Sequence, residues 1–162
     1  MLAQHVRSWA RCRQTPVLRV PLTRAHRSAI GALSCDGRRF LQTQSRAYHS
    51  TEVVGVLRLL LRKISGKLLL IWDGAPIHRG QPIKDCLARG AAKRLQLEQL
   101  PGDAPDLNPV AGICKYLQCR ELGNVCCQDF AELDLALRRA KERLRHKRHV
   151  LRGCITECGY HV

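Results

Sequence analysis

The 162-residue sequence has few aromatic residues, few acidic residues and no long apolar run. Aromatic side chains make up 4% of the chain, so its core has to be built mainly from Leu, Val, Ile and Ala. No stretch reaches the roughly 20 apolar residues of a membrane-spanning helix, and no early apolar segment resembles a secretion signal. We therefore expect neither a membrane partner nor an exported protein.

The scarcity of acids leaves a formal net charge of +15, from 28 Lys and Arg against 13 Asp and Glu. Such an excess favours polyanions, with nucleic acid as the first candidate, although a basic protein without such a partner has the same composition. Residues 1–35 hold several arginines and no acid, as a mitochondrial transit peptide would. Because Pro16 and Pro21 would interrupt a long amphipathic helix, we interpret this segment instead as part of a nucleic-acid-facing surface.

The sequence contains nine cysteines, which stay mostly reduced in a protein that is not secreted. A structural zinc site usually shows two cysteine pairs, each with a short, regular spacing. Here the spacings are irregular, and Cys126 and Cys127 are adjacent. We prefer to interpret the cysteines as scattered buried thiols, and we keep a zinc-binding cysteine-rich protein as an alternative.

Hydrophobic periodicity and turn residues predict a single α/β domain over residues 1–162. A hairpin is expected from Ser28 to Gln44 with its turn at 35–37, and a helix from Ser50 or Thr51 to Gly66. We expect the strands to share one sheet with helices on its faces. The other expected elements are strands at 67–73 and 94–100 and helices at 81–89, 110–122 and 129–149.

Two short segments carry residues with chemical potential. Asp73 follows the apolar run 68–72, at the carboxyl end of a predicted buried parallel strand, which is the edge where α/β sheets bind ligands. His78 lies five residues later. A second strand leads into a proline-rich loop, and a helix begins after Asn108 with Ala111 in its first turn. A lone Asp or His in a loop is often a capping or turn residue, so position alone leaves both roles open.

Two motifs in these segments resemble the catalytic domain of Tc/mariner-type DDE transposases, including their bacterial insertion-sequence relatives. The first, IWDGAPIHRG, matches the family pattern at Asp73, Ala75 and His78. The resemblance extends over nearly the whole chain, from about Trp9 to Val162. The second motif, LEQLPGDAPDLNPVAGICKYL, matches at Leu100, Pro101, Pro105, Leu107, Asn108, Pro109 and Val110.

The resemblance implies an RNase H-like fold, a mixed sheet with flanking helices, in which three carboxylates hold Mg²⁺ or Mn²⁺ ions for phosphodiester cleavage and strand transfer. It makes Asp73 a catalytic metal ligand, with His78 and Asn108 as site neighbours. The third acid position is Ala111, and no acid precedes Asp36, so the first Asp and its central strand are missing. We therefore expect a truncated, catalytically inactive copy whose exposed strand edges favour self-association.

The predicted last helix and tail, residues 129–162, are strongly basic. Their cations would contact DNA phosphates in a salt-dependent manner, and the alternative is a solvated helix face. The main hypothesis is a transposase-derived domain, located in a bacterial cytoplasm and nucleoid-associated when DNA-bound. A non-catalytic basic DNA-binding protein is the second hypothesis. The cations expected to contact DNA are Arg138, Arg139, Lys141, Arg143, Arg145, Lys147 and Arg148.

Overall fold

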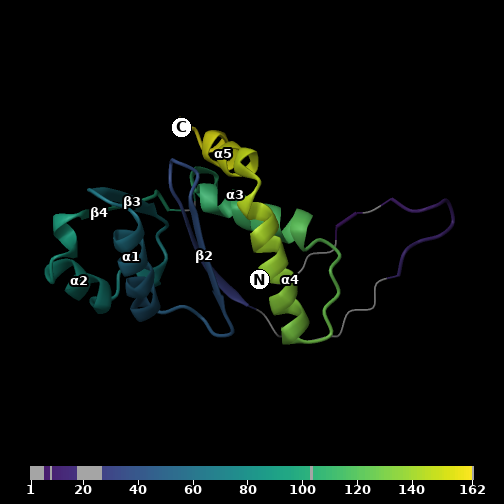
Figure 1. The fold of residues 1–162 in the computed structure, drawn as a ribbon, viewed down its shortest axis with the longest axis horizontal. Coiled ribbons are helices and arrows are strands. Elements are labelled where there is room, and N and C mark those ends of the chain that lie inside the picture. Colours follow the sequence, from purple (N-terminus) through teal and green to yellow (C-terminus); the bar gives the residue numbers. More distant parts are fainter. Residues whose placement is uncertain (1–5, 8, 18–26, 103, 162) are drawn as a thin grey trace. The chain divides into compact units, whose positions relative to one another are not determined.

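The computed structural model describes residues 6–7, 9–17, 27–102 and 104–161, so Pro21 and the neighbouring Arg19 and Arg24 lie outside the described residues. The chain forms two compact units. Unit 1 combines the described residues of Met1–Ser45 and Pro109–Val162, and unit 2 is Arg46–Asn108 (Figure 1). That the whole chain acts as one catalytic domain stays a prediction.

The strands do not form the single sheet expected from the sequence. In the described parts of the chain they form two separate two-stranded sheets, an antiparallel hairpin in unit 1 and a parallel pair in unit 2. Each described strand pairs on one edge only, with a partner from its own unit. The α/β class is correct, but the sheet is divided.

The hairpin of unit 1 is the one that the Asp-Gly turn predicts. Strand β1 (Ser28–Leu33) pairs with β2 (Arg39–Gln44), with Leu33 opposite Arg39. Gly37 adopts a φ of +80°, a conformation that a residue without Cβ reaches without strain. Hydrogen bonds from the Ser34 hydroxyl and from Arg38 lower the pKa of Asp36 to about 2. Asp36 therefore holds the turn together.

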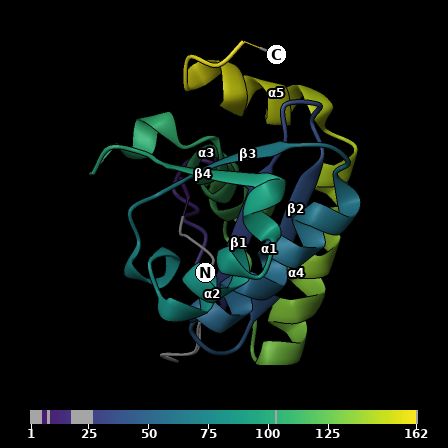
Figure 2. The same cartoon turned by 90° about the vertical axis from the view of Figure 1, so that its left-hand side faces the viewer.

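Three helices complete unit 1 and enclose its core. They are α3 (Pro109–Tyr116), α4 (Phe130–Arg145) and α5 (Arg148–Glu157), and a π-helical turn at Leu117–Glu121 extends α3. Figures 1 and 2 show α4 alongside the hairpin. Their apolar faces meet in one cluster because the leucines recur at helical spacing. The buried residues of this core are Ile113, Leu117, Leu122, Leu133, Leu137, Ala140, Leu144, Leu151 and Cys154.

The predicted single helix over 129–149 is wrong, because the chain turns after Arg145 and begins a second helix at Arg148. A continuous helix would carry Leu151 and the residues after it away from the core. The turn instead buries Leu151, Cys154 and Ile155 in unit 1. Tertiary packing therefore overrides local helix propensity here. No helix in the described residues is long and apolar enough to cross a membrane.

Unit 2 contains α1 (Ser50–Lys63), β3 (Leu68–Trp72), α2 (Gln81–Ala88) and β4 (Leu95–Gln99). Strands β3 and β4 run parallel, and both helices lie on the same side of the pair (Figures 1 and 2). The N-cap of α1 is His49, whose N–H donates to the Glu52 carboxylate over 3.0 Å. The hydroxyl of Ser50, the first residue of α1, donates to the carbonyl of Ile77 over 2.7 Å.

Strand β3 is less buried than its apolar sequence predicts. Leu69 and Ile71 are 55% and 43% exposed, whereas the alternate residues Leu68, Leu70 and Trp72 are partly buried. Successive side chains of a strand point to opposite faces, and the helices of unit 2 cover one face of this pair. The prediction of a strand buried on both faces is therefore wrong for residues 69 and 71.

Candidate functional site

Asp73 lies where the sequence places it, directly after β3 at the carboxyl end of a parallel pair. The ladder continues one step further, because the Leu100 N–H donates to the Trp72 carbonyl over 2.8 Å. The chain then turns, and the Ala75 N–H donates to Oδ1 of Asp73 over 3.1 Å. With 56% of its side chain exposed, the Asp73 carboxylate is open to solvent. Its role as a metal ligand stays a prediction.

His78 is held directly against Asp73. Its Nε2 lies 3.0 Å from Oδ1 of Asp73, and its ring stacks on Trp72 with centroids 4.6 Å apart. Burial lowers the pKa of His78, and the neighbouring Asp73 opposes that shift without cancelling it. With its pKa below 6.5 the imidazole is mostly neutral at pH 7, and because Nε2 faces the Asp73 carboxylate, the ring proton is assigned to Nε2. The sequence-predicted pair Asp73 and His78 is thus brought together.

The other sequence-predicted neighbours follow the loop after β4. Asn108 ends a short helical turn at Pro105–Leu107, and its N–H donates to the Pro105 carbonyl over 3.0 Å. Ala111 lies in the first turn of α3, the helix that the sequence places there. Its methyl side chain offers no ligand to a metal ion. Asp103, in the same loop, lies outside the described residues.

The residues present do not fit a two-metal site. Among the described residues, no group of three or more His, Cys, Asp or Glu side chains could hold a metal ion. Asp73 has a neutral imidazole beside it, whereas Mg²⁺ prefers several oxygen ligands. The same observation gives no support to a zinc site among the described cysteines. Cys154 is buried, and burial raises the pKa of its thiol.

Two of the predicted DNA-binding cations form ion pairs with a buried acid of unit 1, and their contact with DNA stays a prediction. Glu121, in the π-helical turn, is 5% exposed at its side chain. Its Oε2 accepts from Nε of Arg143 over 2.5 Å, and its Oε1 accepts from Nζ of Lys147 over 2.6 Å. Lys147 also donates to the Tyr116 hydroxyl over 3.0 Å. Arg143 and Lys147 therefore join α4 and the α5 N-terminus to the end of α3.

The remaining predicted cations divide by position. Arg138 and Arg139 are exposed on α4. Lys141 donates to the Thr43 hydroxyl over 3.3 Å, and burial lowers its pKa. The charge pattern alone could not separate these roles, because cations that bond to other residues of unit 1 and exposed cations follow one another along α4.

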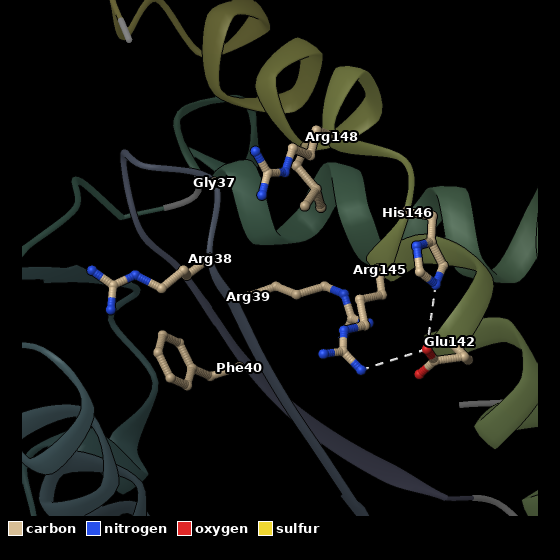
Figure 3. A pocket seen from close by; sticks show the side chains of 9 residues that line it. Gly37, Arg38, Arg39, Phe40, Glu142, Arg145, His146 and Arg148 are labelled. Carbon is tan, nitrogen blue, oxygen red and sulfur yellow. Dashed lines mark ion pairs between the residues drawn. The ribbon is translucent and has the colours of Figure 1, made fainter.

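Arg145 and Arg148 line a pocket of about 690 Å³ in unit 1, together with two arginines that the sequence analysis did not select. These are Arg38 and Arg39, which directly follow the hairpin turn (Figure 3). The Arg39 guanidinium donates to the Lys141 carbonyl, which ties β2 to α4. The sequence signal for these two residues was their position directly after an Asp-Gly turn. That signal could not show that the hairpin packs beside the basic helix.

Comparison with known proteins identifies the family of this chain. The sequence profile described as DDE superfamily endonuclease matches residues 3–134. The chain therefore belongs to the DDE endonuclease superfamily. No curated protein matches the chain.

The fold is similar to that of the Mos1 mariner transposase. The crystal structure of the Mos1 mariner paired end complex with Mn matches with a TM-score of 0.68 at 14% identity, over 98% of this chain and 48% of that one. The Mos1 strand transfer complex matches with a TM-score of 0.55 at 12% identity, over 98% and 51%. The chain thus spans about half the length of these relatives. The likeness supports the predicted RNase H-like α/β fold.

Proposed function

We propose that this chain is a transposase-derived domain that binds DNA and does not cleave it. The family supports DNA as the partner, since the Mos1 matches are a paired end complex and a strand transfer complex. The net charge of +15 supports the same partner, because polyanion binding needs an excess of cations. DNA transposition by metal-dependent cleavage and strand transfer is the ancestral activity in this proposal.

The observation that supports the loss of cleavage is that Asp73 has no second acid at the matching family position. Its carboxylate contacts His78, and the position that matches the last family acid is Ala111, on a helix that begins with Pro109. Stabilising both the attacking and the leaving oxygen of a phosphodiester requires metal ions held by several carboxylates. Within these 162 residues Asp73 is the acid that matches the family motifs, so Mg²⁺ or Mn²⁺ is not bound productively.

A nicking assay on supercoiled plasmid tests this part of the proposal. The 162-residue chain, incubated with Mg²⁺ or Mn²⁺, should leave the plasmid supercoiled. Asp73→Ala is the matched control, since it removes the carboxylate and should change nothing. Metal-dependent nicking that disappears in Asp73→Ala would show that the site is active. DNA binding is tested separately by a gel shift at about 50 mM salt, where absence of a complex would contradict it.

A basic DNA-binding protein with no link to cleavage is the second candidate, and the arginine-lined pocket of unit 1 favours it. Both candidates bind DNA, and both place the protein where DNA is accessible, in the cytoplasm of a bacterium. The two candidates predict different Mn²⁺ affinities at Asp73. In the transposase-derived candidate, the wild-type chain should retain weak Mn²⁺ affinity that Asp73→Ala abolishes, whereas the second candidate predicts no difference.

Self-association is a further part of the proposal. Among the described strands, β3 pairs with β4 alone, and Leu69 and Ile71 are exposed on it. In the family fold, the first strand would lie beside β3, so we propose that this edge lacks its central strand. An unpaired strand edge recruits another strand in trans.

A further inference from the structure

The pocket of unit 1 is a cationic cavity that the Asp73 site does not involve. Its walls come from the end of the hairpin turn and from the α4–α5 junction (Figure 3). Four arginines and one histidine line it, against one acid, Glu142. Such an excess of positive charge in one concave surface concentrates anions.

The arginines of the pocket differ from the cations around Glu121, because they are not neutralised by a buried acid. The Arg148 side chain forms no hydrogen bond or ion pair with any residue that the structure describes. Arg145 contacts Glu142 over 3.6 Å, and both side chains are well exposed. An exposed pair at this distance holds its arginine weakly. Both guanidinium groups are therefore available to an external anion.

Arg39 adds a donor that the protein itself does not satisfy. Its Nε is buried and has no hydrogen-bond partner among the described residues. Burial lowers the pKa of Arg39; the charge of Glu142 opposes that shift, and the charge of Arg145 adds to it. Figure 3 shows the Arg39 side chain reaching from β2 toward Arg145. An anion between them would satisfy the donor and screen the repulsion of the two guanidinium groups.

The start of α5 contributes to the same wall. Arg148 is the first residue of this ten-residue helix, whose N-cap, Lys147, provides no side-chain cap. The first N–H groups of a helix and its dipole favour a negative charge at that end. The positive charge of the pocket and the N-terminus of α5 both favour an anionic ligand.

We propose that this pocket binds a backbone phosphate of DNA, gripped between Arg39 on one side and Arg145 and Arg148 on the other. The inference rests on the proposed DNA binding and names the site that makes the contact. The volume, about 690 Å³, accommodates a phosphodiester with its sugars rather than a lone ion. Because the contact is to phosphate, it fixes the position of the duplex without reading its sequence.

The experiment compares two double variants that remove the same charge from exposed side chains of unit 1. Arg145→Gln with Arg148→Gln removes two positive charges from the pocket. Arg138→Gln with Arg139→Gln removes two positive charges from α4 outside the pocket and is the matched control. DNA affinity, measured by fluorescence anisotropy from 50 to 300 mM salt, should fall roughly tenfold more in the pocket variant. The slope of log affinity against log salt should shrink by about one to two in that variant.

Equal losses in the two variants would overturn the pocket while leaving DNA binding intact. No binding by the wild-type chain would overturn both, whereas plasmid nicking would overturn the loss of cleavage alone. Inorganic phosphate and vesicles of anionic phospholipid serve as competitors. The proposal requires that duplex DNA outcompetes both, and tighter binding to vesicles would contradict it.

A measurement on the wild-type chain covers the case in which a variant does not fold. Phenylglyoxal modifies accessible arginines, and mass spectrometry locates them. Bound DNA should protect Arg145 and Arg148 and leave Arg138 reactive. Protection of Arg138 with a reactive pocket would overturn the assignment.

Discussion

Nε2 of His78 lies 3.0 Å from Oδ1 of Asp73, while the same imidazole stacks on Trp72, the last residue of β3. One ring therefore joins the end of the strand to the carboxylate that follows it. The stack is mostly buried and the carboxylate is mostly exposed, so the two contacts differ in strength. Packing dominates the contribution to stability, and the hydrogen bond mainly fixes the direction of the Asp73 side chain.

His78→Ala should lower the free energy of unfolding by about 1–2 kcal/mol, because it removes a stacked, largely buried ring. His78→Phe should retain most of that stability, since it preserves the stack and removes only the bond to Asp73. Urea denaturation followed by circular dichroism measures both. Equal losses in the two variants would show that the contact with Asp73, rather than the stack, stabilises unit 2.

The Glu121 network should make unit 1 sensitive to acid. Burial raises the pKa of Glu121, but the hydrogen bonds and charges of Lys147 and Arg143 together outweigh burial, so the pKa is lowered from 4.5. A carboxyl whose pKa is lower in the folded state stabilises the protein above its unfolded pKa. That stability is lost as the pH falls below about 4.5 and through the folded pKa.

Glu121→Gln should therefore cost about 1.5–3 kcal/mol at pH 7, the usual range for hydrogen bonds to a charged group, and should flatten the loss of stability between about pH 5 and pH 3. Glu142→Gln is the control, because Glu142 is an exposed acid on the same unit. Thermal unfolding as a function of pH measures the effect. An unchanged pH profile in Glu121→Gln would contradict the assignment.

Leu137→Ala should destabilise unit 1 by about 2–5 kcal/mol, the usual cost of a cavity in a packed core. Leu137 is 1% exposed, whereas Leu135 on the same helix is 48% exposed. Leu135→Ala should thus cost far less. Chemical denaturation of the two variants compares the same chemical change at a buried and an exposed position, and similar losses would mean that α4 packs differently.

Ala111→Glu should not restore cleavage. The substitution adds a carboxylate at the position of the last family acid, but within these 162 residues Asp73 would remain its sole matching partner. The plasmid assay with Mn²⁺ should show no nicking by this variant. Nicking that is lost again when Asp73→Ala is added would mean that two acids suffice.

Leu69→Lys should reduce self-association of the chain, because a charge on an exposed strand opposes pairing in trans. Leu135→Lys, at a similarly exposed leucine on α4, should leave it unchanged. Sedimentation velocity over a range of concentrations distinguishes the two variants. A wild-type chain that stays monomeric at high concentration would remove the basis for this proposal.

The sequence predicts the elements that local signals define. The Asp-Gly turn predicts the hairpin around Gly37, the apolar stripe predicts α1, and the motif at Asp73 predicts the strand end with His78 beside it. These features depend on residues close together in the chain, so periodicity and turn preferences carry the information.

Features set by distant residues could not be predicted in this way. The break between α4 and α5 depends on a core that α3 completes, and Arg143 and Lys147 are occupied by a glutamate more than twenty positions earlier. Arg38 and Arg39 join Arg145 and Arg148 because the hairpin packs beside α4, about 100 residues further along the chain. The spacing of residues along the sequence does not reveal such long-range contacts.

Unit 1 is built from two stretches of chain, with the whole of unit 2 encoded between them. During synthesis the hairpin therefore emerges from the ribosome well before the helices that bury it. At about 5–20 residues per second, the 63 residues of 46–108 delay its partners by several seconds. All the residues of unit 2 lie within that stretch, so they are synthesised before the C-terminal helices of unit 1. The arginines after the hairpin turn are thus synthesised well before the C-terminal helices that complete their pocket.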